Sequence, residues 1–118
     1  MLKRRTISKK ERELILKKTN GRCAYCGEPL CRGFNIDHIA PFQYSRDDSF
    51  DNLMASCRSC NNYKWSWSLE QFRKEIESSV DKLRQYSVNF RFAERYGLIK
   101  GDCFKKVFFY FETLKKAD

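Results

Sequence analysis

The N-terminal part of the chain has the residue spacing and the terminal signals of an α-helix. Ser8 is followed three residues later by Glu11, a capping-box pattern in which side chains satisfy free backbone N–H groups of the first turn. Leu14 and Ile15 continue the helical pattern, and Asn20-Gly21 can end it with a left-handed residue. The pattern therefore predicts a helix that begins at Ser8 and stops before Gly21.

Residues 34–39 alternate apolar and polar residues instead, which is the period of a β-strand. Residues 34–39 predict one short strand, which Pro41 ends, and residues 53–56 predict a second. Residues 42–51 between them predict a polar loop with three aspartates. A helix is predicted over residues 61–65.

The C-terminal half returns to helical spacing. A helix is predicted over residues 69–86, with Ser68 as its cap and four apolar residues on one face: Phe72, Ile76, Val80 and Leu83. A further short helix is predicted from Val88 to Tyr96, because Gly97 can stop it. The aromatic run at 107–111 predicts a buried strand, with Gly101-Asp102 as the turn of a hairpin.

These elements place the chain in the α+β class. At 118 residues it has the length of one domain. We expect a single domain over 1–118, in which a core at 20–66 is flanked by an N-terminal helix and by a C-terminal helical extension at 68–118 with terminal strands. The sequence has no apolar run long enough to span a membrane and no secretory signal pattern, so a cytoplasmic location is predicted.

Charge is distributed unevenly around a formal net charge of +9. Residues 1–22 carry nine Lys or Arg against two Glu, and residues 71–118 carry eleven basic against seven acidic groups. Residues 23–70 are mildly acidic, with four basic and six acidic groups. A basic frame around an acidic middle is typical of a polyanion-binding surface around a divalent-cation site. A merely solubilising surface is the alternative reading of the charge.

Four of the six cysteines form two Cys-x-x-Cys pairs: Cys23 and Cys26, then Cys57 and Cys60. Such pairs can each present two thiolates to one tetrahedral zinc ion, and reduced thiols fit a cytoplasmic protein. Four sulfur ligands close the coordination sphere, so this zinc is expected to be structural. Cys31 and Cys103 are expected to be ordinary positions rather than ligands.

The segment between the two pairs contains the only histidine of the chain. Asp37-His38 is followed by Asn52, then by Asn61 and Lys64. This spacing resembles the HNH endonucleases, which have the ββα-metal fold, and in particular their branch with two zinc-binding knuckles. It is also similar to the HNH domain of the RNA-guided DNA nucleases. The resemblance covers residues 20–66.

The resemblance implies metal-dependent hydrolysis of DNA phosphodiester bonds. His38 would be the general base that takes a proton from water, a role that suits an imidazole at neutral pH. Asp37 and Asn61 would hold one divalent cation, and their hard oxygen donors favour Mg²⁺ or Mn²⁺ over a second zinc. Asn52 would brace the loop and help to orient the histidine. Many members of the family end the motif with histidine, whereas this chain has Asn61.

Each of these residues also has a plain structural reading. Asp37 and Asn52 are common in turns, and Asn61 could cap a helix, while the adjacent Asn62 competes for the ligand position. Arg58 and Lys64 are candidates for contacts with nucleic acid. Two tryptophans, Trp65 and Trp67, could stack on bases but fit packing in the core better.

Three functions follow from these patterns. The first is an HNH endonuclease acting on DNA, expected to be double-stranded, with a protein partner or a homodimer left open. The second is a zinc module that binds nucleic acid without cutting it. The third is a zinc-stabilised protein-interaction domain, which would present residues 108–111 on an exposed surface.

Overall fold

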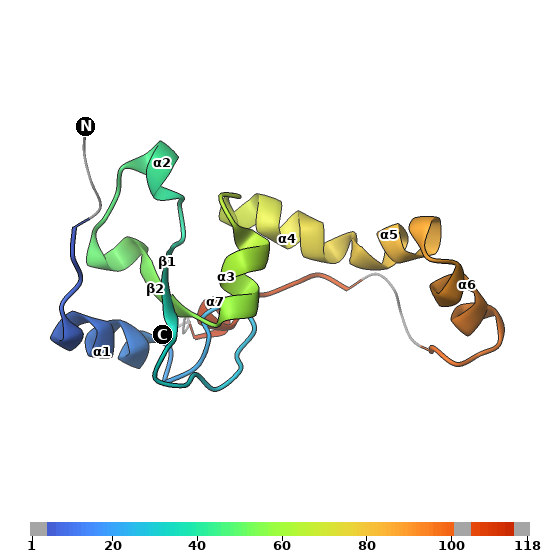
Figure 1. Cartoon of the computed structure of the whole chain (residues 1–118), viewed down its shortest axis with the longest axis horizontal. Coiled ribbons are helices and arrows are strands. Elements are labelled where there is room, and N and C mark those ends of the chain that lie inside the picture. Colours follow the sequence, from blue (N-terminus) through green and yellow to red (C-terminus); the bar gives the residue numbers. More distant parts are fainter. Residues whose placement is uncertain (1–4, 101–104, 115–118) are drawn as a thin grey trace.

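The structure is a computed structural model, and it describes residues 5–100 and 105–114. A two-stranded sheet lies among helices, which confirms the α+β class (Figure 1). The elements follow one another as α1 (Lys9–Lys18), β1 (Asn35–His38), α2 (Phe42–Ser45), a 3₁₀ turn η1 (Phe50–Asn52), β2 (Leu53–Ser56), α3 (Arg58–Lys64), α4 (Leu69–Glu77), α5 (Ser79–Tyr86), α6 (Val88–Arg95) and α7 (Tyr110–Thr113).

The first helix has the predicted termini. The Ser8 side chain accepts a hydrogen bond from the backbone N–H of Glu11, and the helix is followed by two residues with positive φ, Asn20 at 56° and Gly21 at 76°. Its buried residue Ile15 packs with Leu53 and Ala55 of β2. The helix therefore covers the second strand of the sheet.

Both predicted strands are present, and they pair antiparallel. Asp37 lies opposite Met54, and His38 lies opposite Leu53 at the end of the hairpin. Helix α3 contacts β1 (Figure 1). Strand, strand and helix thus form a ββα unit over residues 35–64.

Two predictions in this unit need correction. The segment at 42–51 is not wholly a loop, since it contains α2 and the start of η1. Helix α3 begins at Arg58 rather than at residue 61, because the sulfur of Cys57 acts as the N-cap and accepts a hydrogen bond from the backbone N–H of Cys60. The second Cys-x-x-Cys pair therefore forms the first turn of the helix that carries Asn61.

The predicted helix over residues 69–86 is broken. It ends as α4 at Glu77 and starts again as α5 at Ser79. The hydroxyls of Ser78 and Ser79 both donate to the carbonyl of Glu75, and such bonds compete with regular helical geometry. Helix α4 buries Phe72, whereas α5 and α6 bury none of their residues and extend away from the body of the molecule (Figure 1).

The aromatic run at 107–111 is not a strand. The chain is extended up to Phe109 and then turns into α7. The segment is held by hydrogen bonds to the residues between the first two cysteines. The backbone N–H groups of Tyr110 and Phe111 donate to the carbonyls of Tyr25 and Ala24, at 3.1 and 2.8 Å. The predicted hairpin turn at 101–102 lies outside the described residues.

An aromatic cluster joins this tail to the rest of the protein. The rings of Tyr25, Phe72 and Phe109 lie 5.1–5.5 Å apart and are all buried. Residues from the first cysteine pair, from α4 and from the tail thus share one core, which such ring contacts stabilise beyond their buried area.

A buried guanidinium fixes the tail to α4. Arg73 donates to the carbonyl of Val107 at 2.7 Å and forms an ion pair with Glu112 at 2.5 Å. Its guanidinium group also lies over the ring of Phe109. We expect Arg73→Leu to lower the free energy of unfolding by about 3 kcal/mol, because the ion pair with Glu112 and the hydrogen bond to the Val107 carbonyl are both lost. Urea denaturation measures this effect, and Lys74→Leu, an exposed change on the same helix, is the control. Equal stability of the two variants would contradict the assignment.

Candidate metal and catalytic site

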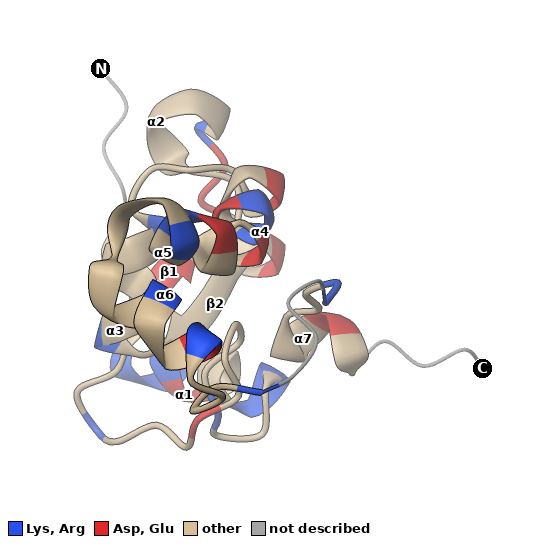
Figure 2. Cartoon of the chain, turned by 90° about the vertical axis from the view of Figure 1, so that its right-hand side faces the viewer, with Lys and Arg blue, Asp and Glu red and all other residues tan. Residues whose placement is uncertain are grey.

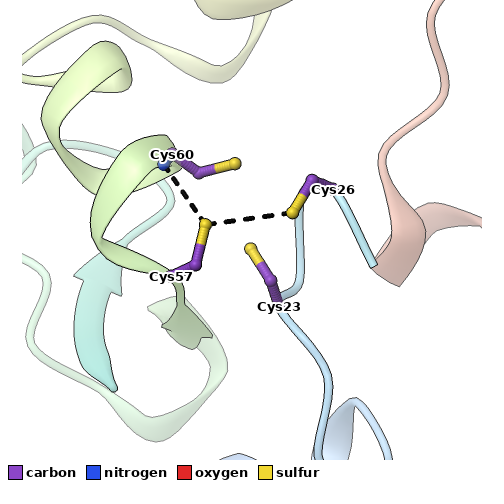
Figure 3. A group of neighbouring side chains, drawn as sticks. All are labelled: Cys23, Cys26, Cys57 and Cys60. Carbon is purple, nitrogen blue, oxygen red and sulfur yellow. Dashed lines mark hydrogen bonds between the residues drawn. The ribbon is translucent and has the colours of Figure 1, made fainter. Parts of the chain in front are cut away.

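Four sulfur atoms converge between the first cysteine pair and the start of α3 (Figure 3). The sulfurs of Cys23, Cys26, Cys57 and Cys60 all lie within 4.8 Å of one another, and those of Cys26 and Cys57 are 3.8 Å apart. A tetrahedron with zinc–sulfur bonds of about 2.3 Å has edges of about 3.8 Å. The four cysteines can therefore hold one zinc ion, as predicted, while Cys31 is exposed and lies outside the cluster. Cys103 is outside the described residues.

The sulfurs strongly affect one another's ionisation. A hydrogen bond from the Cys60 thiol lowers the pKa of Cys23 to about 4, and this same bond raises the pKa of Cys60. Burial raises the pKa of Cys26 to about 11. Ionisation of one cysteine is thus favoured and ionisation of the others is opposed. A bound cation is therefore needed before all four sulfurs can carry negative charge.

A second site lies beside the first, between β1 and α3. Asp37, His38 and Asn61 line one cavity of about 400 Å³, together with Asn62 and Trp65. The two strands and the helix bring these residues together from positions 24 apart in the chain. Asn52 does not line this cavity.

His38 is held by a residue that the motif does not include. Its ring atom Nε2 lies 2.7 Å from Oδ1 of Asp48, and both side chains are largely buried. Burial opposes the ionisation of Asp48, but hydrogen bonds from the backbone of Arg5 and from His38 outweigh it, so the pKa of Asp48 lies below its ordinary value. An ionised Asp48 makes Nε2 the protonated nitrogen, which leaves the lone pair on Nδ1. Among the described residues, Nδ1 of His38 has no hydrogen-bond partner.

Asn52 ties together the two ends of the loop that carries Asp48. Its side chain accepts from the backbone N–H of Ala40 at 2.9 Å and donates to the carbonyls of Ala40 and Asp47, at 3.0 and 2.8 Å. Its backbone carbonyl also accepts from Ile39. Asn52 thereby fixes the residue directly before Asp48.

Asp37 is positioned by two buried groups. Its Oδ2 accepts hydrogen bonds from the Tyr25 hydroxyl at 2.5 Å and from the Lys64 ammonium at 3.0 Å, and Lys64 also donates to the carbonyl of His38 at 2.9 Å. Burial, followed by the nearby charge of Asp37, raises the pKa of Tyr25, which keeps this hydroxyl protonated as a donor. Because both donors bind Oδ2, Oδ1 is the oxygen of Asp37 that can take a further ligand.

The predicted contact of Lys64 with nucleic acid is wrong. The Lys64 side chain is fully buried, and its ammonium is used within the protein by Asp37 and His38. Arg58 is exposed, so that its side chain can reach a ligand. The preference for core packing holds for Trp67, which packs against the aromatic cluster, but not for Trp65, which is 75% exposed.

Part of the positive charge of the C-terminal extension is paired within the extension itself. Figure 2 shows Lys and Arg interleaved with Asp and Glu along α4 and α5. Arg84 pairs with Glu94 and Asp81, and Lys82 pairs with Glu75. These charges are therefore less available to a polyanion than the net charge of the region indicates.

Asp48 and Tyr25 are the site residues that the sequence reasoning missed. Asp48 is one of three aspartates in the polar loop, and nothing in its spacing separates it from Asp47 or Asp51. The signal for Tyr25 was its place inside the first cysteine pair, which suggested only a turn.

Comparison with known proteins supports the assignment of this region. Residues 23–66 match the family model described as HNH endonuclease, so this segment is an HNH domain. No curated protein matches the chain. None of the helices in the described parts of the chain is long and apolar enough to cross a membrane.

Proposed function

Starting from the HNH domain at residues 23–66, we propose that this protein is a metal-dependent endonuclease that hydrolyses phosphodiester bonds in DNA. The observation that carries the proposal is the cavity where Asp37, His38 and Asn61 meet, with Nδ1 of His38 free to accept a proton. An HNH domain implies a nuclease-type function on nucleic acid, and the cavity supplies the groups that such a reaction needs.

The residues of the cavity fit a hard divalent cation. Oδ1 of Asp37 and the amide oxygen of Asn61 are the donors that Mg²⁺ or Mn²⁺ prefers, and the cavity of about 400 Å³ leaves room for waters and a phosphate. Such an ion, when bound, neutralises charge on the phosphate and on the departing oxygen. Tyr25 and Lys64 would hold the carboxylate of Asp37 in the orientation that this ligand requires.

The proton transfer is assigned to His38. Its Nδ1 takes a proton from a water molecule as that water attacks phosphorus, and the ring becomes an imidazolium. Asp48, hydrogen-bonded to Nε2, stabilises the positive ring and holds its orientation, while Asn52 holds the loop of Asp48. The new bond joins the water oxygen to phosphorus. The bond between phosphorus and the departing sugar oxygen breaks.

The setting of the reaction is also a proposal. We expect double-stranded DNA as the substrate, with Arg58 at its backbone, and weak sequence preference, because phosphate contacts carry no sequence information. A protein partner or a homodimer would supply further specificity. The whole chain, residues 1–118, is proposed to act as one domain in the cytoplasm, where thiols stay reduced for zinc.

Plasmid cleavage tests the proposal. We expect supercoiled plasmid to be nicked with Mg²⁺ or Mn²⁺ and to stay intact when neither metal is added. Asn61→Ala should lower the rate about 100-fold, because it removes an oxygen ligand. Asn62→Ala, which removes the competing amide of the same cavity, should lose much less activity, and this difference between two variants purified in the same way excludes a contaminating nuclease. Binding of plasmid without cleavage under either metal would favour the non-catalytic zinc module instead.

A further inference from the structure

Trp65 has a conformation that its residue type disfavours. It follows the last residue of α3 and has φ 48° and ψ −122°, a region that residues other than glycine rarely adopt. Its side chain is 75% exposed. A large apolar ring is thus presented to solvent by a strained backbone.

The local fold does not require a tryptophan at this position. The backbone N–H of Trp65 donates to the carbonyl of Asn61 and ends the helix, a role that any residue with this backbone performs and that glycine performs without strain. Trp67, two residues later, contrasts with it. Its ring meets that of Tyr63 at 5.7 Å and packs against the aromatic core. Trp67 therefore has a structural task that Trp65 lacks.

The position of Trp65 connects it to the chemistry. It lines the same cavity as Asp37, His38 and Asn61, and the other aromatic residue that lines this cavity, Phe42, is buried. Among the exposed apolar side chains in the described ranges, Trp65 is the one on this cavity. Residues with strained backbone conformations cluster at active sites and at ligand-binding sites. Trp65 therefore belongs to the cavity that is proposed to hold the scissile phosphate.

We propose that Trp65 stacks on a nucleobase of the strand whose phosphate occupies the cavity. The inference rests on the proposed function, since it identifies what lies next to the scissile phosphate. Stacking on an aromatic ring tolerates any base, because every base has a flat face, so the contact positions the strand without selecting a sequence. The base must have an open face, which a single strand or a frayed or nicked duplex offers.

Fluorescence tests the stacking without requiring cleavage. The chain has two tryptophans, so Trp67→Phe leaves Trp65 as the only one, and Trp65→Phe is the matched reverse variant. Without added Mg²⁺ or Mn²⁺, a single-stranded oligothymidylate should quench the emission of the Trp67→Phe protein by about half or more and leave that of the Trp65→Phe protein unchanged. An abasic oligonucleotide of equal length, which has the phosphates but no bases, should not quench either protein.

Quenching by the abasic strand equal to that by oligothymidylate, or no quenching of Trp65, would overturn the stacking. In cleavage assays, Trp65→Ala should raise KM about tenfold while kcat changes less, and Trp65→Phe should restore part of the loss. The two proposals fail separately. Base-dependent quenching without cleavage would support the stacking and contradict the nuclease function. Cleavage without any quenching of Trp65 would support the nuclease function and contradict the stacking.

Discussion

His38→Ala is expected to lower the rate constant of plasmid cleavage about 1,000-fold. General-base catalysis by a positioned imidazole typically contributes 10²–10⁴-fold, and the chain has no second histidine to take over the role. The loss should appear in kcat at saturating Mg²⁺, because His38 does not supply a ligand oxygen in this assignment. Single-turnover cleavage of a supercoiled plasmid measures it.

Asp48→Asn provides the graded comparison. Asparagine can turn its amide N–H toward Nε2, which would place the proton on Nδ1 and remove the base from part of the molecules. We expect a loss of about 10–100-fold in kcat, with partial recovery in Asp48→Glu. Asp47→Asn, the change at the exposed neighbour, is the control and should have little effect.

The assignment of the base fails if His38→Ala cleaves as fast as the wild type while it keeps its zinc and its circular dichroism spectrum. A slow variant that has also lost zinc would instead report misfolding. Zinc content is therefore measured in the same preparations.

Much of the site was predictable because its signals are local in the sequence. The spacing within each Cys-x-x-Cys pair sets what one turn can present, and the alternating residues 34–39 set the strand that carries His38. Ser8 and Glu11 likewise specify a helix start within four residues. In each of these cases a short stretch of chain determines its own geometry.

The features that were missed depend on contacts between distant segments. Asp48, rather than the neighbouring aspartates, faces His38 because Asn52 and Arg5 fix the loop from outside it. The aromatic tail has strand composition, but its hydrogen bonds go to Ala24 in the first cysteine pair. Composition alone cannot supply these partners.

Tyr25 connects the two sites. It lies between Cys23 and Cys26, and its hydroxyl donates to Asp37 while its ring packs in the aromatic core. On the other side, Cys60 directly precedes Asn61 on α3. Asp37 is thus held by a residue inside the first cysteine pair, and Asn61 directly follows a cysteine of the second, so we expect the geometry of the cavity to depend on the sulfur cluster being closed.

Loss of zinc is therefore expected to unfold the HNH domain and abolish cleavage together. Structural zinc contributes about 10–16 kcal/mol in small zinc domains, which matches or exceeds the whole stability of a typical domain. Cys60→Ser should purify without zinc, lose the cooperative thermal transition and lose the near-ultraviolet signal of the packed rings. Wild-type protein treated with a strong chelator should behave in the same way and recover when zinc is restored.

Cys31→Ser is the matched control, because Cys31 is exposed and lies outside the cluster, and it should keep one zinc per chain and wild-type cleavage. Each of the two variants replaces one sulfur atom with oxygen, so any difference between them arises from the position of the change. If Cys60→Ser kept a cooperative transition and active cleavage, the cluster would not be what holds Asp37 and Asn61 in place. The aromatic core around Tyr25 and Phe72 would then have to position them without the metal.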